Sequence, residues 1–415
     1  MDRASAADAT FAAAGGAGWR VIGDHAAAWF ETGSYATGAA LIARIAASIP
    51  AAELPEFDLR PRGLRVRVRP DPDRATTISA TAAALGLRTD PAALAELGLV
   101  IQTGDAEDSG GRQGVRTFWR QVLAYRQSVG GGLADPLHRD PPVRFTRLDV
   151  PRPLRNRLHL DVGRPAAAVD AIRTAVGQQP HGPFQVALDD PDGNEVDLCP
   201  GGPLSTEPGT DDWQAMFSAL AFYPAATGAA VQLLTEVAGI ADAAGLPLSV
   251  DLRPDGVLID SGKDQWETAT GADPAFVALA MRIQQAAAEL GLASDPAPYR
   301  FIQIGIDVAD IPAAREFWRS VLGYRNDPRP WVTDIYDPRR LNPVIFFQDL
   351  DTSDADRVLQ RNRLHLEVSI PAEQLDTLLA TGLAAGGRRL DPGAVDVPRR
   401  GLADPEGNEL WLLGY

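Results

Sequence analysis

Two histidines in nearly identical settings are the side chains of this sequence best suited to chemistry. The octapeptide RNRLHLDV contains His159, and RNRLHLEV contains His365, so each histidine stands two residues before a carboxylate. Because side chains alternate across a strand, Asp161 shares a strand face with His159, and Glu367 shares one with His365. Imidazole exchanges protons near neutral pH. We therefore predict both histidines as catalytic residues and both acids as ligand-binding residues; the alternative is a pair of structural histidines.

The octapeptide recurs because most of the chain is duplicated. Three further pairs of segments follow one another in the same order in both halves: FWRQVLAYR with FWRSVLGYR, DPDGNEVDL with DPEGNELWL, and DLRPRG with DLRPDG. Such spacing indicates two copies of a domain-sized unit of roughly 200 residues, in place of the short repeats of a solenoid.

Composition limits the class of protein and its partners. Of 415 residues, 45% are hydrophobic and 23% charged, and the net charge of −16 opposes binding to nucleic acid or to anionic membranes. No apolar run is long enough for a membrane span. One cysteine, Cys199, excludes an intramolecular disulfide. We expect a flexible tail over residues 1–17 without a secretory signal, a cytoplasmic location and a small-molecule partner.

Each copy divides into two parts with different patterns. The first part reads as two short strands, an alanine-rich helix, a strand and a second helix. The second part reads as a strand–helix–strands unit that occurs twice. The predicted fold class is thus α+β with an internal duplication. The predicted boundaries are a tail at 1–17, modules at 18–97 and 98–201, a linker at 202–210, and modules at 211–296 and 297–415.

The modules at 98–201 and 297–415 resemble the vicinal-oxygen-chelate superfamily, in its glyoxalase-like or bleomycin-resistance branch, which would fit a bacterial protein. The resemblance rests on FWR in the first helix, NRLHL followed by an acid, and DP followed by an acid and GNE, in that order. It implies paired units that build a curved, mostly antiparallel sheet with helices outside and a cavity inside.

The resemblance also implies a divalent metal site in the first of these modules. Metal-dependent members place ligands on the first strand, on the strand that opens the second half and on the last strand. By strand alternation, Gln102, His159 and Asp197 are the inward residues there, and one nitrogen with two oxygens could hold a divalent ion. A hydrogen-bonded polar cavity wall is the alternative.

The second of these modules lacks a complete ligand set. Gln303 and His365 stand at the matching positions, but Trp411 replaces the last ligand, and an indole does not coordinate a metal. We predict that Gln303 and Trp411 bind a ligand, with the indole ring stacked on a flat molecule. The alternative for Trp411 is core packing.

The modules at 18–97 and 211–296 resemble pterin-4a-carbinolamine dehydratases in a leading tryptophan, Trp19 or Trp213, and in the helix and strand that follow. The histidines of that family are missing, since Leu54 and Leu246 stand before the retained prolines. Dehydration needs a group that transfers a proton near neutral pH. We therefore expect degenerate modules that serve for packing, dimerisation or ligand binding.

Three functions stay open at this point. The first is binding or sequestering of a ring-containing metabolite or drug in the glyoxalase-like cavities. The second is a lyase or isomerase reaction in the cavity of His159, and the third is a pterin-4a-carbinolamine dehydratase-like reaction. Fold alone does not separate them. Binding or sequestering is the prediction, because the missing histidines weigh against the dehydratase and the incomplete ligand sets weigh against a metal-dependent lyase or isomerase. Whether the chain is an enzyme, whether its copies pack as an intrachain pseudo-dimer and whether it forms homo-oligomers also stay open.

Overall fold

Helices and strands both occur along the whole described chain. The structure is a computed structural model that describes residues 18–104, 114–128, 130–391 and 399–415, together with Phe11 and Gly16. The tail expected over residues 1–17 lies otherwise outside these residues. The mixed α and β class and the two-segment repeat are confirmed. No helix in the described part of the chain is long and apolar enough to cross a membrane.

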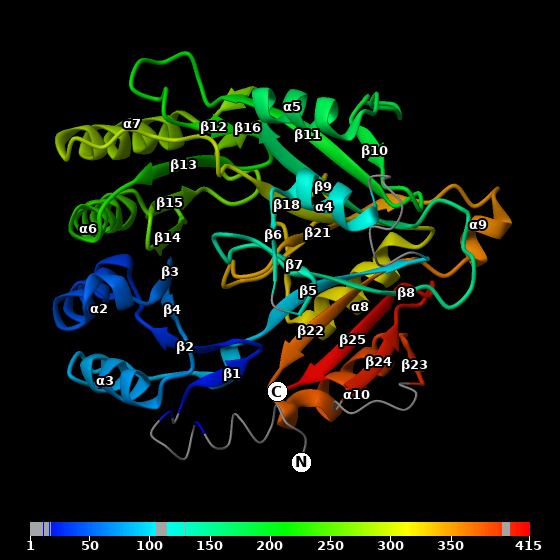
Figure 1. The fold of residues 1–415 in the computed structure, drawn as a ribbon, viewed down its shortest axis with the longest axis horizontal. Helices are drawn as coiled ribbons and strands as arrows, with labels where there is room; N and C mark the ends of the chain where they lie inside the picture. The colour runs from blue at the N-terminus through cyan, green and yellow to red at the C-terminus, as the bar shows by residue number, and fades with distance from the viewer. Residues whose placement is uncertain (1–10, 12–15, 17, 105–113, 129, 392–398) are drawn as a thin grey trace.

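The two N-terminal modules of the repeats share one antiparallel sheet. The order of its central strands is β2-β4-β3-β14-β15-β13, and Figure 1 shows their helices gathered on one side of it. The first module contributes β1 (Arg20–Ile22), β2 (His25–Glu31), α2 (Tyr35–Ser48), β3 (Glu56–Arg60), β4 (Gly63–Val68) and α3 (Pro72–Ala83). The second contributes β12 (Gln214–Ala215), β13 (Ala219–Pro224), α6 (Thr227–Ala244), β14 (Ser249–Arg253), β15 (Gly256–Asp260) and α7 (Pro274–Glu289).

Local sequence signals fix the starts of these helices. Ser34 accepts a hydrogen bond from the backbone N–H of Thr37 at the start of α2. Asp71 and Asp273 do the same for α3 and α7, and each precedes a proline in the first turn. A side-chain oxygen at this position satisfies N–H groups that have no partner within the helix, and proline there loses no hydrogen bond.

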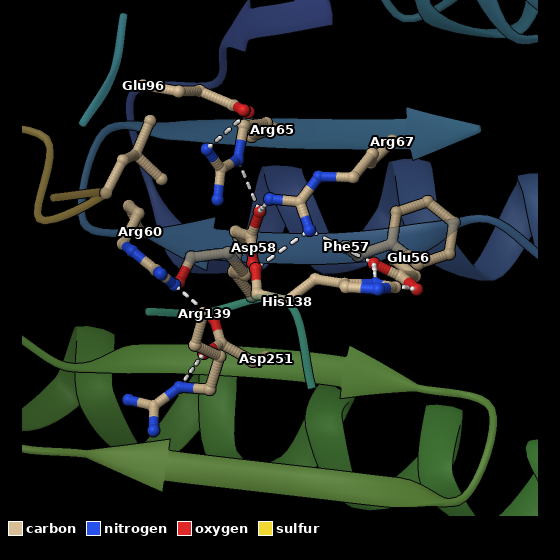
Figure 2. A network of polar contacts seen from close by, with 12 residues as sticks. Glu56, Phe57, Asp58, Arg60, Arg65, Arg67, Glu96, His138, Arg139 and Asp251 are labelled. Carbon is tan, nitrogen blue, oxygen red and sulfur yellow. Dashed lines mark hydrogen bonds and ion pairs between the residues drawn. The ribbon is translucent and has the colours of Figure 1, made fainter. Parts of the chain in front are cut away.

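A pseudo-twofold axis passes through the junction of the two modules. Strands β3 and β14 pair antiparallel with Asp58 directly opposite Asp251, the first residues of DLRPRG and DLRPDG. Arg253 Nη2 donates to Asp58 Oδ1 and Arg60 Nη1 donates to Asp251 Oδ1, each at 2.6 Å. Figure 2 shows the Asp58 side of this network, with Arg65 and Arg67 also directed at the carboxylate. The repeats therefore meet through crossed, buried ion pairs.

The C-terminal parts of the repeats contain four strand–helix–strands units. In the first repeat these are β5 (Glu96–Thr103), α4 (Val115–Leu123), β6 (Arg126–Gln127), β7 (Leu133–Ala134) and β8 (Val143–Arg147), then β9 (Leu158–Pro165), α5 (Ala166–Val176), β10 (Ala187–Asp189) and β11 (Glu195–Pro203). In the second they are β18 (Phe301–Val308), α8 (Ile311–Leu322), β19 (Arg325–Asn326), β20 (Ile335–Tyr336) and β21 (Val344–Asp349), then β22 (Leu364–Ile370), α10 (Leu375–Ala384), β23 (Arg388–Leu390), β24 (Arg399–Ala403) and β25 (Glu409–Gly414).

These units exchange partners between the repeats. Strand β9 of the first repeat pairs with β18 of the second, and β22 of the second pairs with β5 of the first. Neither residues 98–201 nor residues 297–415 therefore form a sheet by themselves, because each sheet combines units of both repeats. All four units carry the same alternation, so the hydrophobic pattern fits either partner, and the pairing is decided only by tertiary packing.

One hydrophobic core joins the two exchanged sheets. Helix α4 packs on α5, and α8 packs on α10, although the members of each pair belong to different sheets. The repeated motifs anchor this core, because Trp119 Nε1 donates to Asp190 at 2.8 Å and Trp318 Nε1 donates to Asp404 at 3.0 Å. The apolar faces are thus covered by helices, and the opposite faces of the two sheets carry polar residues. The expected linker at 202–210 begins inside β11, which runs to Pro203.

Candidate metal centre

Polar side chains from three adjacent strands meet on the inner face of the sheet formed by β11, β9 and β18. The register places Asp161 between Asp197 on β11 and Gln303 on β18 in one row across the sheet. His159, two residues earlier on β9, shares the face of Asp161 and lies opposite Gly305. Since β18 comes from the second repeat, this site is built by both copies.

The side-chain atoms of this cluster are close enough to bind one ion. His159, Asp161 and Asp197 each offer a ligand atom, and these atoms all lie within 4.8 Å of one another. His159 Nε2 is 3.5 Å from Asp161 Oδ1, and Gln303 Nε2 donates to Asp161 Oδ2 at 2.8 Å. The imidazole also meets the ring of Phe346 edge to face, with 5.8 Å between centroids.

Several buried atoms of the cluster have no hydrogen-bond partner. His159 and Gln303 are each 2% exposed and Asp161 is 8% exposed. The unpartnered atoms are His159 Nδ1, Asp161 Oδ1, Asp197 Oδ1, Gln303 Oε1 and, in the next row, Asp307 Oδ1. A buried polar atom without a partner costs about 1–3 kcal/mol. One nitrogen and several oxygens left unpaired in one place fit a bound divalent cation.

The electrostatics of the cluster favour the same ligand. Burial raises the pKa of Asp161, and burial together with the Asp161 carboxylate raises the pKa of Asp197 to about 6. Two neighbouring acids are neutralised by arginines: Glu195 accepts from Arg155 at 2.7 and 2.5 Å, and Asp307 accepts from Arg357 at 2.5 Å. Within residues 18–104, 114–128, 130–391 and 399–415, no arginine or lysine forms an ion pair with Asp161 or Asp197. A cation would relieve their mutual repulsion.

The predicted ligand Gln102 does not belong to this cluster. It lies on β5 in the other sheet, where its N–H donates to the carbonyl of Arg363 and its side-chain oxygen accepts from Arg152. In the sheet of β9 and β18, the equivalent backbone hydrogen bond runs from the N–H of Asp307 to the carbonyl of Arg157. Asp307 is therefore the counterpart of Gln102. The interpretation of Gln102 as a ligand beside His159 and Asp197 is therefore corrected.

The strand pairing explains this error. Across β22 and β5, His365 lies opposite Val100 and Glu367 lies opposite Gly98, so Gly98 is the counterpart of Gln303. In sequence Gln102 of β5 matches Gln303 of β18, but in the structure it occupies the position of Asp307, four residues further along. The reason is that the register of a strand is set by the strand beside it. Asp161 and Gln303, predicted as ligand-binding residues, are the side chains that complete the cluster with His159 and Asp197.

The matching position around His365 in the other sheet contains cations where the His159 cluster has acids without an arginine or lysine partner. Burial lowers the pKa of His365 to about 4, against the opposing effect of Glu409. Glu367 forms an ion pair with Arg144. Trp411 takes the place of Asp197, as its pairing with Glu367 shows, and the guanidinium of Arg399 lies 4.4 Å from its ring centroid. The set of His159, Asp161, Asp197 and Gln303 is thus not repeated around His365.

The fold and the His159 cluster can now be compared with known protein families. The family model of the glyoxalase-like domain matches residues 103–199 and 303–413, just over half of the chain. The chain belongs to the glyoxalase-like domain family. Both matched segments fall inside the predicted modules at 98–201 and 297–415, so that resemblance is confirmed, whereas the resemblance to pterin dehydratases stays a prediction.

Solved structures show similarity of low identity, and none of the curated proteins matches the chain. A glyoxalase/bleomycin resistance protein from Albidiferax ferrireducens T118 is 20% identical over 27% of this chain and 94% of its own, with a TM-score of 0.21. A glyoxalase-related enzyme from Fulvimarina pelagi is 20% identical over 27% of this chain and 84% of its own, with a TM-score of 0.21. Glyoxalase I from Zea mays is 10% identical over 77% of this chain and 92% of its own, with a TM-score of 0.34.

Proposed function

We propose that the protein binds a divalent metal ion through His159, Asp161, Asp197 and Gln303 and sequesters a small, ring-containing metabolite or drug in the same cavity. The observation that carries the proposal is the group of unpartnered buried atoms that three strands from two repeats bring together. Buried polar atoms are nearly always satisfied in folded proteins, so this concentration points to a bound group.

The donor set indicates the kind of ion and its use. An imidazole nitrogen with carboxylate and amide oxygens suits a divalent transition metal better than a soft ion that prefers sulfur. When bound, such an ion acts as a Lewis acid toward an oxygen of the ligand. The chain itself contributes the flat ring of Phe346, which holds the imidazole of His159 in place and offers an apolar wall to a ligand.

Binding is better supported than a lyase or isomerase reaction. A reaction of that kind needs a group that transfers a proton in addition to the metal ligands. Glu195 lies next to His159 across β11 and β9, but both its oxygens accept hydrogen bonds from Arg155. Asp307 Oδ1 lies 4.0 Å from His159 Nδ1, and the other carboxylate oxygen of Asp307 accepts from Arg357. The two acids beside the ligand set are therefore each part of an ion pair, which favours sequestering over turnover.

We also propose that the modules at 18–97 and 211–296 serve as a scaffold without dehydratase activity. Leu54 and Leu246 pack against the core of these modules. His25 lies outside the histidine motif of the dehydratases, and its Nε2 is 3.1 Å from Glu96 Oε1. The shared sheet with its crossed ion pairs gives these modules a packing role that needs no catalytic residue.

Metal content tests the main proposal directly. Protein purified without chelator, and then loaded with Zn²⁺, Mn²⁺ or Ni²⁺ and desalted, should retain one equivalent of metal per chain. His159→Ala should abolish this binding, whereas His365→Ala, the same change at the matching position of the other cavity, should leave it intact. Equal losses from both variants, or no retained metal in the parent protein, would overturn the proposal.

A further inference from the structure

A cavity of about 160 Å³ lies between the second N-terminal module and the sheet that carries the metal cluster. Its wall is formed by β14, by the segment after β15 and by the chain around β18, β20 and β21. Among its lining residues are Arg60, Arg139, Ser249, Lys263, Tyr336 and Arg340. A single water needs roughly 10–15 Å³ of such space, so a molecule of about ten non-hydrogen atoms would fit.

Most charges around this cavity are already paired. Arg139 donates to Asp251 and to Asp260, each at 2.7 Å, and Figure 2 shows Arg139 and Arg60 directed at the same Asp251 carboxylate. Lys263 Nζ is 2.5 Å from Asp334. Arg300, which also lines the cavity, donates to Asp140 at 2.7 Å. These cations therefore leave little net charge for a ligand.

Arg340 is the exception. Its Nη1 donates to the carbonyls of Ser261 at 2.8 Å and Pro247 at 3.3 Å, and no ion pair with an acid is formed by it in the described part of the chain. Burial lowers the pKa of this guanidinium, and the nearby Arg60 lowers it further. Arg60 itself uses Nη1 for Asp251 and Nε for the carbonyl of Arg340 at 2.9 Å. Both arginines line the cavity, and within the described residues neither Nη2 group takes part in these hydrogen bonds.

The loop after Asp135 in the first repeat corresponds to the loop of Arg340 in the second, and it has no arginine at the matching position. Asp135 and Asp337 anchor the two loops through the same backbone N–H groups, which makes His138 the counterpart of Arg340. Both residues have a positive φ, 50° and 54°. His138 Nδ1 lies 2.8 Å from Glu56 Oε1, so this imidazole has an acidic partner within the protein. The loop geometry is common to both copies, whereas the unpaired cation belongs to the second.

The cavity adjoins the metal cluster. Lys263 lines the cavity, and its Nζ lies 5.2 Å from the ring centroid of Phe346, the residue that packs edge to face on His159. Phe301, another lining residue, shares a strand face with Gln303 on β18. A ligand in the cavity would therefore point along the same face of the sheet toward the cluster.

We infer that this cavity binds the anionic group of a small organic acid, a carboxylate or a phosphate, with Arg340 as its charge partner and Arg60 as a second donor. A planar guanidinium forms strong, paired hydrogen bonds with either group. One consequence rests on the proposed function: the molecule held at the metal cluster is an organic anion whose acidic end lies in this cavity.

Binding of benzoate and of inorganic phosphate tests the inference without any metal. Titration of chelator-treated full-length protein, followed by calorimetry, should show one site per chain for at least one of these probes, and the comparison tells which acidic group is preferred. Arg340→Gln should weaken that binding at least tenfold. Arg339→Gln removes the same charge from the neighbouring residue, which does not line the cavity, and should leave binding unchanged.

Two further measurements make the outcome decisive. If Arg340→Gln fails to fold, phenylglyoxal modification of Arg340 in the wild-type protein, mapped by mass spectrometry, should be slowed by the bound probe while that of Arg339 is not. Repeating the titration with His159→Ala separates the two proposals, since anion binding to the metal-free cavity should survive that change. Equal effects of the Arg339 and Arg340 variants, or no binding of either probe to the wild-type protein at millimolar concentration, would overturn the inference.

Discussion

Gln303 of the second repeat donates a hydrogen bond of 2.8 Å to Asp161 of the first, across the antiparallel pair of β18 and β9. Gln303 Oε1 and Asp161 Oδ1, on the same inner face, have no hydrogen-bond partner among the described residues. The row of Asp197, Asp161 and Gln303 is consequently complete only because the repeats exchange their units. The first repeat on its own would have His159, Asp161 and Asp197 but not the amide that completes the row.

Gln303 and Gln102, which lie in different sheets, provide a matched test of this arrangement. Gln303→Ala should weaken metal binding about tenfold or more, because it removes one oxygen and frees the Asp161 carboxylate, and losses of 10–100-fold are typical even for residues that only orient a ligand. Gln102→Ala should leave the affinity unchanged, since Gln102 lies on β5 beside Arg363. Competition with a chelating dye measures both affinities. A loss with Gln102→Ala as large as with Gln303→Ala would favour the ligand set of a single repeat.

The stability of the metal-free protein should depend on pH through the same carboxylates. The pKa of Asp197 is raised to about 6, and that of Asp161 is raised as well, whereas an aspartate in an unfolded chain titrates near 4. The folded protein therefore holds these protons more tightly than the unfolded chain. Their contribution to the free energy of unfolding is fully present below about pH 4 and is lost as pH rises toward 6.

Asp197→Asn isolates this effect because asparagine does not titrate. In the presence of chelator, the Tm of the wild-type protein relative to that of the variant should decrease as pH rises from 4 to 6. Added metal should act in the opposite direction, since it requires deprotonated carboxylates, and should raise the wild-type Tm more at pH 7 than at pH 5. A Tm difference between the two proteins that does not change over this range would contradict the expectation.

The absence of dehydratase activity is a separate expectation. Leu54 and Leu246 pack on the core where the dehydratases carry a histidine, so neither N-terminal module has a group there that transfers a proton. Incubation with a 4a-hydroxytetrahydropterin should show no dehydration above the uncatalysed rate. Turnover that disappears after a substitution within residues 18–97 or 211–296 would reveal a different catalytic group in those modules.

The faces of the strands could be predicted from the sequence, whereas the pairing of the strands could not. Alternation correctly placed His159 with Asp161 and put Asp197 on the same inner face, because side-chain direction along a strand is a local property. The partner of β9 is not local: β5 and β18 carry similar patterns, and only packing of the whole chain selects β18. For the same reason the sequence likeness of Gln102 and Gln303 led to the wrong register, since a strand's register is set by the strand beside it.

The crossed ion pairs at the pseudo-twofold axis should dominate the stability of the N-terminal modules. Asp58 is fully buried and interacts with Arg253, Arg65 and Arg67, which hold the pKa of its carboxyl well below the ordinary value despite its burial. Removing one partner of a buried ion pair leaves an uncompensated charge and costs about 3–5 kcal/mol. Asp58→Ala should therefore lower the free energy of unfolding by that amount.

Denaturation with urea measures the change, and Asp255→Ala, at an exposed position in the turn between β14 and β15, is the control, with an expected effect within about 0.5 kcal/mol. The pH dependence adds a second readout. Because the folded pKa of Asp58 lies below its unfolded value, its stabilisation is present above about pH 4 and is lost as pH falls further. The difference in unfolding free energy between the wild-type protein and Asp58→Ala should shrink on acidification. An effect of Asp58→Ala no larger than that of Asp255→Ala would show that the junction of the repeats is held by the apolar core alone.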